Sequence, residues 1–146
     1  MAARKHEQKK PPLQVFISYV PEDADLARRL AEALREAGYQ PWYAEESVSP
    51  GENWALRIGQ AILGSDVIVA LLSPSTFRSP WARREWDFAL GSERHAGRVI
   101  PVLTPGTSLD TVPWILKHLK HIRSGPDWRK TTREVVGQMR HLEGAA

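Results

Sequence analysis

A tryptophan and a glutamate stand four residues apart in the stretch SPWARREWDFAL, which runs from Ser79 to Leu90. Ser79 can cap a helix and Pro80 suits the first helical position, so Trp81 and Glu85 are predicted to share one helical face. A carboxylate held beside an aromatic wall can stabilise a positive charge that develops during a reaction. The other interpretation is that Glu85 is a solvated surface charge, which is the usual state of a helical glutamate.

Strands and helices alternate along the rest of the chain and must position this pair. Short apolar runs predict strands at 13–19, 39–46, 66–73, 98–103 and, briefly, 121–123. Helical spacing of apolar residues predicts helices at 23–38, 52–63, 81–92 and 127–144. This alternation indicates one α/β domain with three layers, in which a largely parallel sheet carries helices on both faces.

Apolar runs and prolines indicate where individual strands lie in the sheet. The run from Asp66 to Ser73 is apolar at six consecutive positions, which is typical of a central strand covered on both faces. Pro41 has no backbone N–H for a neighbouring strand, so it favours an edge strand or a strand start. Pro101 is awkward in the fourth strand unless that side of the sheet is ragged or bulged.

The carboxyl ends of parallel strands are where ligands bind in such folds. After the first strand the sequence has Ser18 and Tyr19, after the second the loop Glu45–Asn53, and after the third the turn Ser73–Ser79. The helix with the tryptophan and the glutamate follows this last turn. The sequence therefore predicts a site at this edge of the sheet.

Charge is unevenly distributed along the 146 residues. The formal net charge is +3, and residues 1–12, predicted to be a flexible basic tail, hold four of the 20 Lys and Arg and one of the 17 Asp and Glu. Residues 13–146 therefore carry 16 side chains of each sign. A neutral folded part argues against binding to nucleic acid, which needs an excess of Lys and Arg on one face.

The chain has no cysteine, which excludes disulfides and sulfur-bound zinc and is compatible with a reducing cytoplasm. No uninterrupted apolar run reaches about 18 residues, so no membrane span is expected. His118 and His121 have no acidic partner in a metal-binding motif, so no metal site is expected. A cytoplasmic protein without a membrane or nucleic-acid partner is the resulting prediction.

Four pieces of the chain match a known family in their order and spacing. They are VFISY (15–19), PGENW (50–54), SDVIVALLSPSTFRSPWARREW (65–86) and VIPVL (99–103). From Gln14 to Leu142 the chain resembles a TIR (Toll/interleukin-1 receptor) domain of the prokaryotic kind, and a TIR domain is expected over residues 13–143. The resemblance implies a flavodoxin-like sandwich with five parallel strands in the order 2-1-3-4-5, which places the Pro41 strand at an edge.

Many bacterial, plant and axonal TIR domains cleave NAD⁺ between nicotinamide and ribose, with a catalytic glutamate that many bacterial members carry in a W-x-x-x-E pattern. Trp81 and Glu85 match that pattern, so the resemblance implies an NAD⁺ glycohydrolase that uses NAD⁺ as substrate and needs no cofactor. The expected substrate-binding residues lie at the strand ends and in the adjoining loops: Phe16, Ser18, Tyr19, Ser49, Trp54, Arg57, Ser73, Arg78 and Trp81.

The chemistry of this bond suits a single carboxylate. Nicotinamide leaves as a neutral base and needs no proton from a general acid. The ribose gains oxocarbenium character, which an anion such as Glu85 stabilises more than it stabilises the ground state. Backbone N–H groups after Ser18 and at Ser79, with Arg57 or Arg78, are candidates for binding the pyrophosphate.

Other TIR domains act as scaffolds that transmit signals by self-assembly. The alternative function is therefore a non-catalytic module whose Glu45–Asn53 loop docks on a neighbouring TIR domain, in signalling or interference with a host. Catalytic TIR domains also assemble, so a homo-oligomer or filament formed through this loop is expected for the active enzyme, in signalling or anti-phage defence.

The sequence lacks the motifs of two other classes of α/β protein, response-regulator receivers and nucleotide-binding enzymes. The acids from Glu22 to Asp25 resemble the acidic pocket of response-regulator receivers, which share this sheet order. A receiver also needs a phosphoacceptor aspartate at the end of strand three, where this chain has Leu72 and Ser73, so the acids are expected to serve a helix N-terminus. The absence of G-x-G-x-x-G and P-loop motifs argues against a dehydrogenase or a nucleotide triphosphatase.

Overall fold

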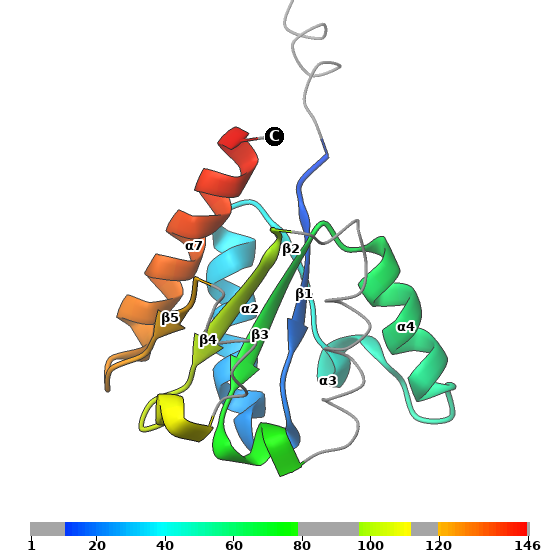
Figure 1. Ribbon diagram of the computed structural model, residues 1–146. Coiled ribbons are helices and arrows are strands. Elements are labelled where there is room, and N and C mark those ends of the chain that lie inside the picture. Colours follow the sequence, from blue (N-terminus) through cyan, green and yellow to red (C-terminus); the bar gives the residue numbers. More distant parts are fainter. Residues whose placement is uncertain (1–10, 79–96, 112–119, 146) are drawn as a thin grey trace, which may run out of the picture.

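The chain folds around a parallel five-stranded sheet, shown in a computed structural model that describes residues 11–78, 97–111 and 120–145 (Figure 1). The strands are β1 (Gln14–Ser18), β2 (Gln40–Trp42), β3 (Val67–Leu72), β4 (Val99–Leu103) and β5 (Ile122–Arg123). Their order in the sheet is β2-β1-β3-β4-β5, and every neighbouring pair is parallel. The predicted flavodoxin-like order is confirmed, with Pro41 in the edge strand β2.

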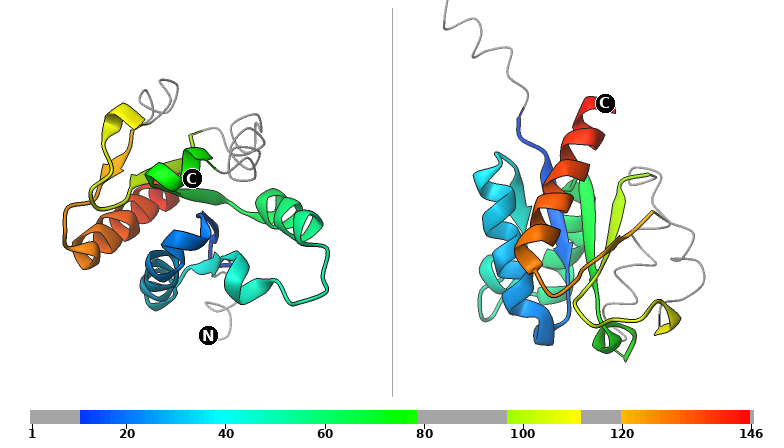
Figure 2. Two further views of the ribbon diagram at one scale, coloured as in Figure 1. Left: turned by 90° about the horizontal axis from the view of Figure 1, so that it is seen from below. Right: turned by 90° about the vertical axis from the view of Figure 1, so that its left-hand side faces the viewer.

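Helices cover both faces of the sheet. Helices α2 (Ala24–Glu36) and α7 (Trp128–Ala145) lie on one face and α4 (Trp54–Gly64) lies on the other (Figure 2). Alternate residues of the strands point to the two faces. The core under α2 and α7 includes Val15, Ile17, Val67, Val69, Leu71 and Val102. The smaller core under α4 contains Phe16, Ile58, Ile62 and Ile68.

Pro101 fits in β4 because its backbone nitrogen, which has no hydrogen to donate, faces the side of the strand where β5 has not yet begun to pair. Thr104 N–H donates to the Leu72 carbonyl of β3 at 2.9 Å, whereas the Leu103 carbonyl accepts from Ser124 N–H on the other side at 2.9 Å. Since backbone groups alternate along a strand, Pro101 faces the same side as Leu103, toward β5. Pairing with β5 begins only at Val102, so the ragged side expected from the sequence is present.

The sequence-based boundary of the second strand was wrong at its end. Strand β2 ends at Trp42, and Ala44–Ser47 form the short helix α3 instead of continuing the strand. The Ser47 and Val48 N–H groups donate to the Tyr43 and Ala44 carbonyls at 3.1 and 2.9 Å. Alanine and glutamate favour helix over strand, which agrees with the helical turn that begins at Ala44.

Short 3₁₀ turns follow the carboxyl ends of three strands. They are η1 (Pro21–Asp23) after β1, η2 (Pro74–Arg78) after β3 and η4 (Leu109–Thr111) after β4. η2 and η4 lie at the lower edge of the sheet in Figure 1. This edge therefore brings together three segments that are far apart in the sequence.

Candidate functional site

Buried hydroxyl groups gather at the carboxyl edge of the sheet. They belong to Ser18, Ser73, Thr76, Thr104 and Thr107, whose exposed fractions are between 3% and 8%. β1 and β3 are neighbours there, and the chain leaves β1 toward β2 but leaves β3 toward β4. Such a switch point is where ligands bind in open α/β sheets. The structure thus has a polar edge at the place predicted for a site.

Two similar turns make this edge rigid. Ser73 N–H donates to Thr76 Oγ1 at 2.9 Å, and the Thr76 hydroxyl donates to the Leu71 carbonyl at 3.3 Å. After β4, the Thr104 hydroxyl donates to the Leu72 carbonyl at 3.1 Å and lies 2.8 Å from the Thr107 hydroxyl. Each turn thus adds a side-chain hydrogen bond to a backbone carbonyl at the end of β3.

Asp23 also belongs to this edge, although the sequence had assigned it to a helix start. It stands at the N-cap position of α2, but its side chain makes no capping hydrogen bond. Burial raises the pKa of Asp23, the Ser73 side chain opposes that rise, and the nearby charge of Glu22 adds to it. The influence of Ser73 shows that its side chain, after β3, lies near the Asp23 carboxyl group, after β1. No spacing rule in the sequence points to this contact.

The predicted residues of β1 have three different environments. Ser18 ends the strand and is 3% exposed, at the edge described above. Phe16 is buried and stacks on Trp42 with ring centroids 5.2 Å apart, so it packs under α4. The Tyr19 hydroxyl accepts a hydrogen bond from Glu45 N–H at 2.9 Å, so it ties the end of β1 to the loop after β2.

The loop Glu45–Asn53 is held by contacts with its own domain. Arg57 donates to the Ser47 carbonyl at 3.0 Å, and its Nε lies 3.1 Å from Glu52 Oε2, as an ion pair rather than an aligned hydrogen bond. Glu52 in turn accepts from Ser49 N–H at 2.8 Å. Arg35 pairs with Glu46 at 3.0 Å. Arg57 therefore organises the loop, and its charge is partly neutralised there.

Arg78 is the other cation predicted near the site. It is exposed at the end of η2, and its guanidinium donates to Ser75 Oγ at 2.9 Å. No ion pair of Arg78 with a carboxylate is found within the described part of the chain. Of the two arginines, Arg78 keeps more of its charge available to an anion.

The remaining predicted residues cannot be placed relative to this edge. Glu85 and Trp81 lie in 79–96, outside the described residues, as do Ser79 and the predicted third helix. Trp54 begins α4, and its side chain lies outside the described part as well. The structure therefore brings together Ser18, Ser73 and Asp23, and it shows Ser49 with Arg57 in the neighbouring loop.

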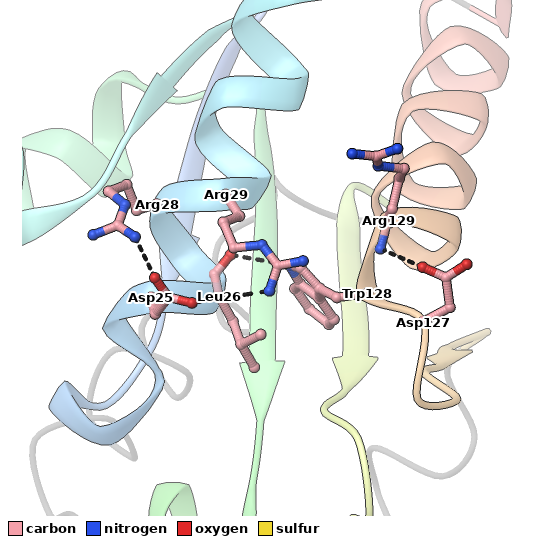
Figure 3. Close-up of polar contacts among 7 residues, drawn as sticks. All are labelled: Asp25, Leu26, Arg28, Arg29, Asp127, Trp128 and Arg129. Atoms are coloured by element: carbon pink, nitrogen blue, oxygen red, sulfur yellow. Dashed lines mark hydrogen bonds and ion pairs between the residues drawn. The ribbon is translucent and has the colours of Figure 1, made fainter.

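The structure has a groove between α2 and α7. This α2–α7 groove has a volume of about 610 Å³ and is lined by Arg29, Glu32, Ala33, Glu36, Ala37, Trp128, Arg129, Thr132, Arg133 and Val136. Figure 3 shows its lower end, where the Trp128 indole N–H donates to the Leu26 carbonyl at 3.2 Å. Asp25 pairs there with Arg28, and Asp127 accepts from Arg129 N–H at 3.1 Å.

Within 11–78, 97–111 and 120–145, no helix is long and apolar enough to cross a membrane. The same residues contain no group of three or more His, Cys, Asp or Glu side chains arranged to hold a metal ion.

Two curated proteins show what the chain is similar to. An NAD(+) hydrolase, PdTIR of Paracoccus denitrificans, is 35% identical over 95 residues, which are 63% of this chain and 31% of that protein. A 2′ cyclic ADP-D-ribose synthase, BtTIR of Bacteroides thetaiotaomicron, is 27% identical over 128 residues, covering 73% and 45%. The chain thus spans less than half the length of these curated relatives.

A solved structure agrees with this similarity. The metazoan TIR-STING receptor from C. gigas, solved in complex with 2′,3′-cGAMP, superposes with a TM-score of 0.75 at 27% identity, over 88% of this chain and 40% of that one. The family model described as TIR domain matches residues 15–138, which is most of the chain. The polar strand-end edge, the strand order and these matches agree, and the chain belongs to the TIR domain family.

Proposed function

We propose that this TIR domain is an NAD⁺ glycohydrolase that releases nicotinamide and forms ADP-ribose or a cyclic isomer of it. The observation that carries the proposal is the hydroxyl-lined edge at the switch point between β1 and β3, which continues through Arg78 into the segment with Trp81 and Glu85. Relatives named as an NAD(+) hydrolase and a 2′ cyclic ADP-D-ribose synthase support this reaction class.

Glu85 is the proposed catalytic residue. As the glycosidic bond breaks, its carboxylate stabilises the positive charge that develops on the ribose, and nicotinamide departs as a neutral base. Trp81, four residues earlier and on the same face of the helix predicted from the sequence, is proposed to wall the carboxylate from water and to stack on a flat ring of the substrate. Capture of the ribosyl cation by water gives the linear product, and capture by an adenine nitrogen gives a cyclic one.

Arg78 is the proposed cationic partner of the pyrophosphate. It is exposed and free of a carboxylate partner among the described residues, whereas Arg57 is engaged by Glu52 and Ser47. Backbone N–H groups after Ser18 and at Ser79 complete the proposed phosphate site. Ser73, buried at the strand end, is assigned to the ribose side of the substrate.

Activity is proposed to require self-association in the cytoplasm, through the Glu45–Asn53 loop. The loop is pre-formed by its bonds to Arg57 and Arg35, so docking of a second copy orders few new residues. The Tyr19 hydroxyl connects this loop to the end of β1, beside the proposed substrate site. A role in signalling or anti-phage defence is proposed for the assembled enzyme.

A non-catalytic scaffold is the second candidate function. It is favoured by the similarity to a TIR-STING receptor, a signalling protein by name, and by the well-ordered loop. In that case the same loop joins TIR domains, and the strand-end edge has no substrate.

The experiment that separates the two is nicotinamide release from NAD⁺ by dilute and concentrated protein, beside Glu85→Gln. The enzyme predicts release that rises more than in proportion to protein concentration and falls at least about 100-fold in a folded Glu85→Gln variant. Equal release by both proteins removes Glu85 from the mechanism. Absence of release at every concentration, together with assembly seen by light scattering, favours the scaffold.

A further inference from the structure

We propose that Asp23 is a substrate-binding residue that accepts a hydrogen bond from a ribose hydroxyl of the dinucleotide. The inference rests on the proposed function, since it names a contact with the same substrate at the same edge. It starts from the position of the side chain. Asp23 lies in η1, directly after β1, and its carboxyl group is near the side chain of Ser73, which follows β3, so it lies at the switch point of the sheet.

One carboxylate oxygen of Asp23 has unused hydrogen-bonding capacity. Oδ2 is shielded from solvent and has no hydrogen-bond partner in the part of the chain that the structure describes. A buried acceptor without a donor destabilises the folded state, so such groups are few in native proteins. This carboxylate is therefore a candidate to receive a donor from outside the domain.

The local structure does not use Asp23 as the sequence position suggests. An aspartate at an N-cap commonly accepts a hydrogen bond from the first helical turn, and Asp23 makes none. Asp25, two residues later, has the ordinary surface role and pairs with Arg28 and Arg29. The charge of Asp23 is turned toward the strand ends instead of supporting the helix.

The chemistry of the donor follows from the carboxylate. An ionised carboxyl group only accepts hydrogen bonds and repels the pyrophosphate, whereas a ribose offers hydroxyl donors. In other α/β folds a carboxylate near the strand ends accepts a ribose hydroxyl of a dinucleotide. The side chain is only half-buried, and the last torsion of aspartate is broad, so a modest rotation presents Oδ2 to a ligand at the edge.

The test measures NAD⁺ binding by calorimetry in a Glu85→Gln background, which avoids turnover. Asp23→Asn removes the charge with little change of shape, Asp23→Ala removes the acceptor, and Asp25→Asn is a matched control two residues away. Loss of a charged hydrogen bond predicts a Kd about 10-fold higher for Asp23→Asn, at least as high for Asp23→Ala, and within about twofold of the parent for Asp25→Asn. A melting temperature of Asp23→Asn that is not lowered excludes damage to the fold.

The outcomes separate this inference from the proposed function. An unchanged Kd in both Asp23 variants, with nicotinamide release by the wild type, overturns the inference and leaves the enzyme. A raised Kd without release by the wild type supports Asp23 as a binding residue and removes the reaction. No NAD⁺ binding by the parent overturns both. With an active wild type, a raised KM and a melting temperature that is not lowered in Asp23→Asn support the inference.

Discussion

The strand-end edge and the α2–α7 groove both carry polar groups, but they differ in how these groups are satisfied. In the groove, Glu32 and Glu36 on α2 and Arg129 and Arg133 on α7 are exposed to water. At the strand-end edge, the hydroxyl groups of five residues are nearly inaccessible, and a carboxylate oxygen of Asp23 has no partner among the described residues.

The difference indicates that volume alone is a poor guide to function in this domain. The groove is a seam between two helices, and its deepest residue, Trp128, uses its indole N–H inside the domain, on the Leu26 carbonyl. Charged side chains at its rim are solvated and need no ligand. The strand-end edge retains an uncompensated acceptor in Asp23 Oδ2, which is a feature that folding alone does not favour.

Trp128→Ala is expected to have the largest effect, because it removes the floor of the groove. Trp128 is 3% exposed and belongs to the main core. Truncation of a buried tryptophan should lower the free energy of unfolding by about 3–5 kcal/mol, measured by urea denaturation. A loss below about 1 kcal/mol would show that the groove is not a structural seam.

Thr76→Val tests the rigidity of the strand-end edge. The substitution keeps the shape of the side chain but leaves Ser73 N–H and the Leu71 carbonyl without their partner. We expect a loss of about 1–3 kcal/mol in the same denaturation experiment. A variant as stable as the wild type would mean that water replaces the hydroxyl and that the edge is open.

Arg78→Ala should weaken substrate binding without unfolding the domain, since Arg78 is exposed. Loss of a charge-assisted bond to the pyrophosphate predicts a KM for NAD⁺ about 10-fold higher. The matched control is Arg133→Ala in the groove, for which KM should stay within about twofold. Equal effects of the two substitutions would indicate general electrostatic attraction instead of a site at the strand ends.

Asp23→Asn should have the smallest effect on stability and a distinctive dependence on pH. Burial and the charge of Glu22 raise the pKa of Asp23 above its ordinary value of 3.8, and the Ser73 side chain only partly offsets this rise. Between that value and the raised pKa, the native state binds more protons than the unfolded state, so stability falls as pH rises through this window.

Asparagine does not titrate, so the stability of the variant does not fall as the pH rises through this window. Its melting temperature should match that of the wild type at or below about pH 3.8 and exceed it at neutral pH, as measured by thermal scans across the window. A wild type that is the more stable protein at neutral pH would indicate a compensated, structural carboxylate.

Much of the fold could be predicted from the sequence, because local patterns determine it. Six apolar residues identified β3 as a buried central strand, and the prolines marked an edge strand in β2 and the ragged side of β4. The end of β2 could not be predicted well. Both a strand and a helical turn suit residues 44–46, and the choice depends on backbone bonds formed in the folded domain.

The contacts at the strand-end edge were predicted less completely, since they join distant segments. Ser18 and Ser73 lie at the carboxyl ends of β1 and β3, where the sequence placed them, and their role in a site stays a prediction. The hydrogen bond from Glu45 N–H to the Tyr19 hydroxyl joins residues 26 positions apart, and no periodic pattern in the sequence predicts it. Asp23 was assigned to a helix start together with the other acids from Glu22 to Asp25, and only the contacts of the folded domain distinguish it from Asp25.

The central claim is that NAD⁺ binds at the strand-end edge and not in the α2–α7 groove. It is tested most directly by amide spectra of ¹⁵N-labelled Glu85→Gln protein titrated with NAD⁺. The account predicts saturable shifts of the Ser18–Asp23 and Ser73–Arg78 amides, with the groove residues Glu32, Glu36, Thr132 and Val136 unchanged. Shifts confined to those groove residues, with the strand-end amides unmoved, would contradict it.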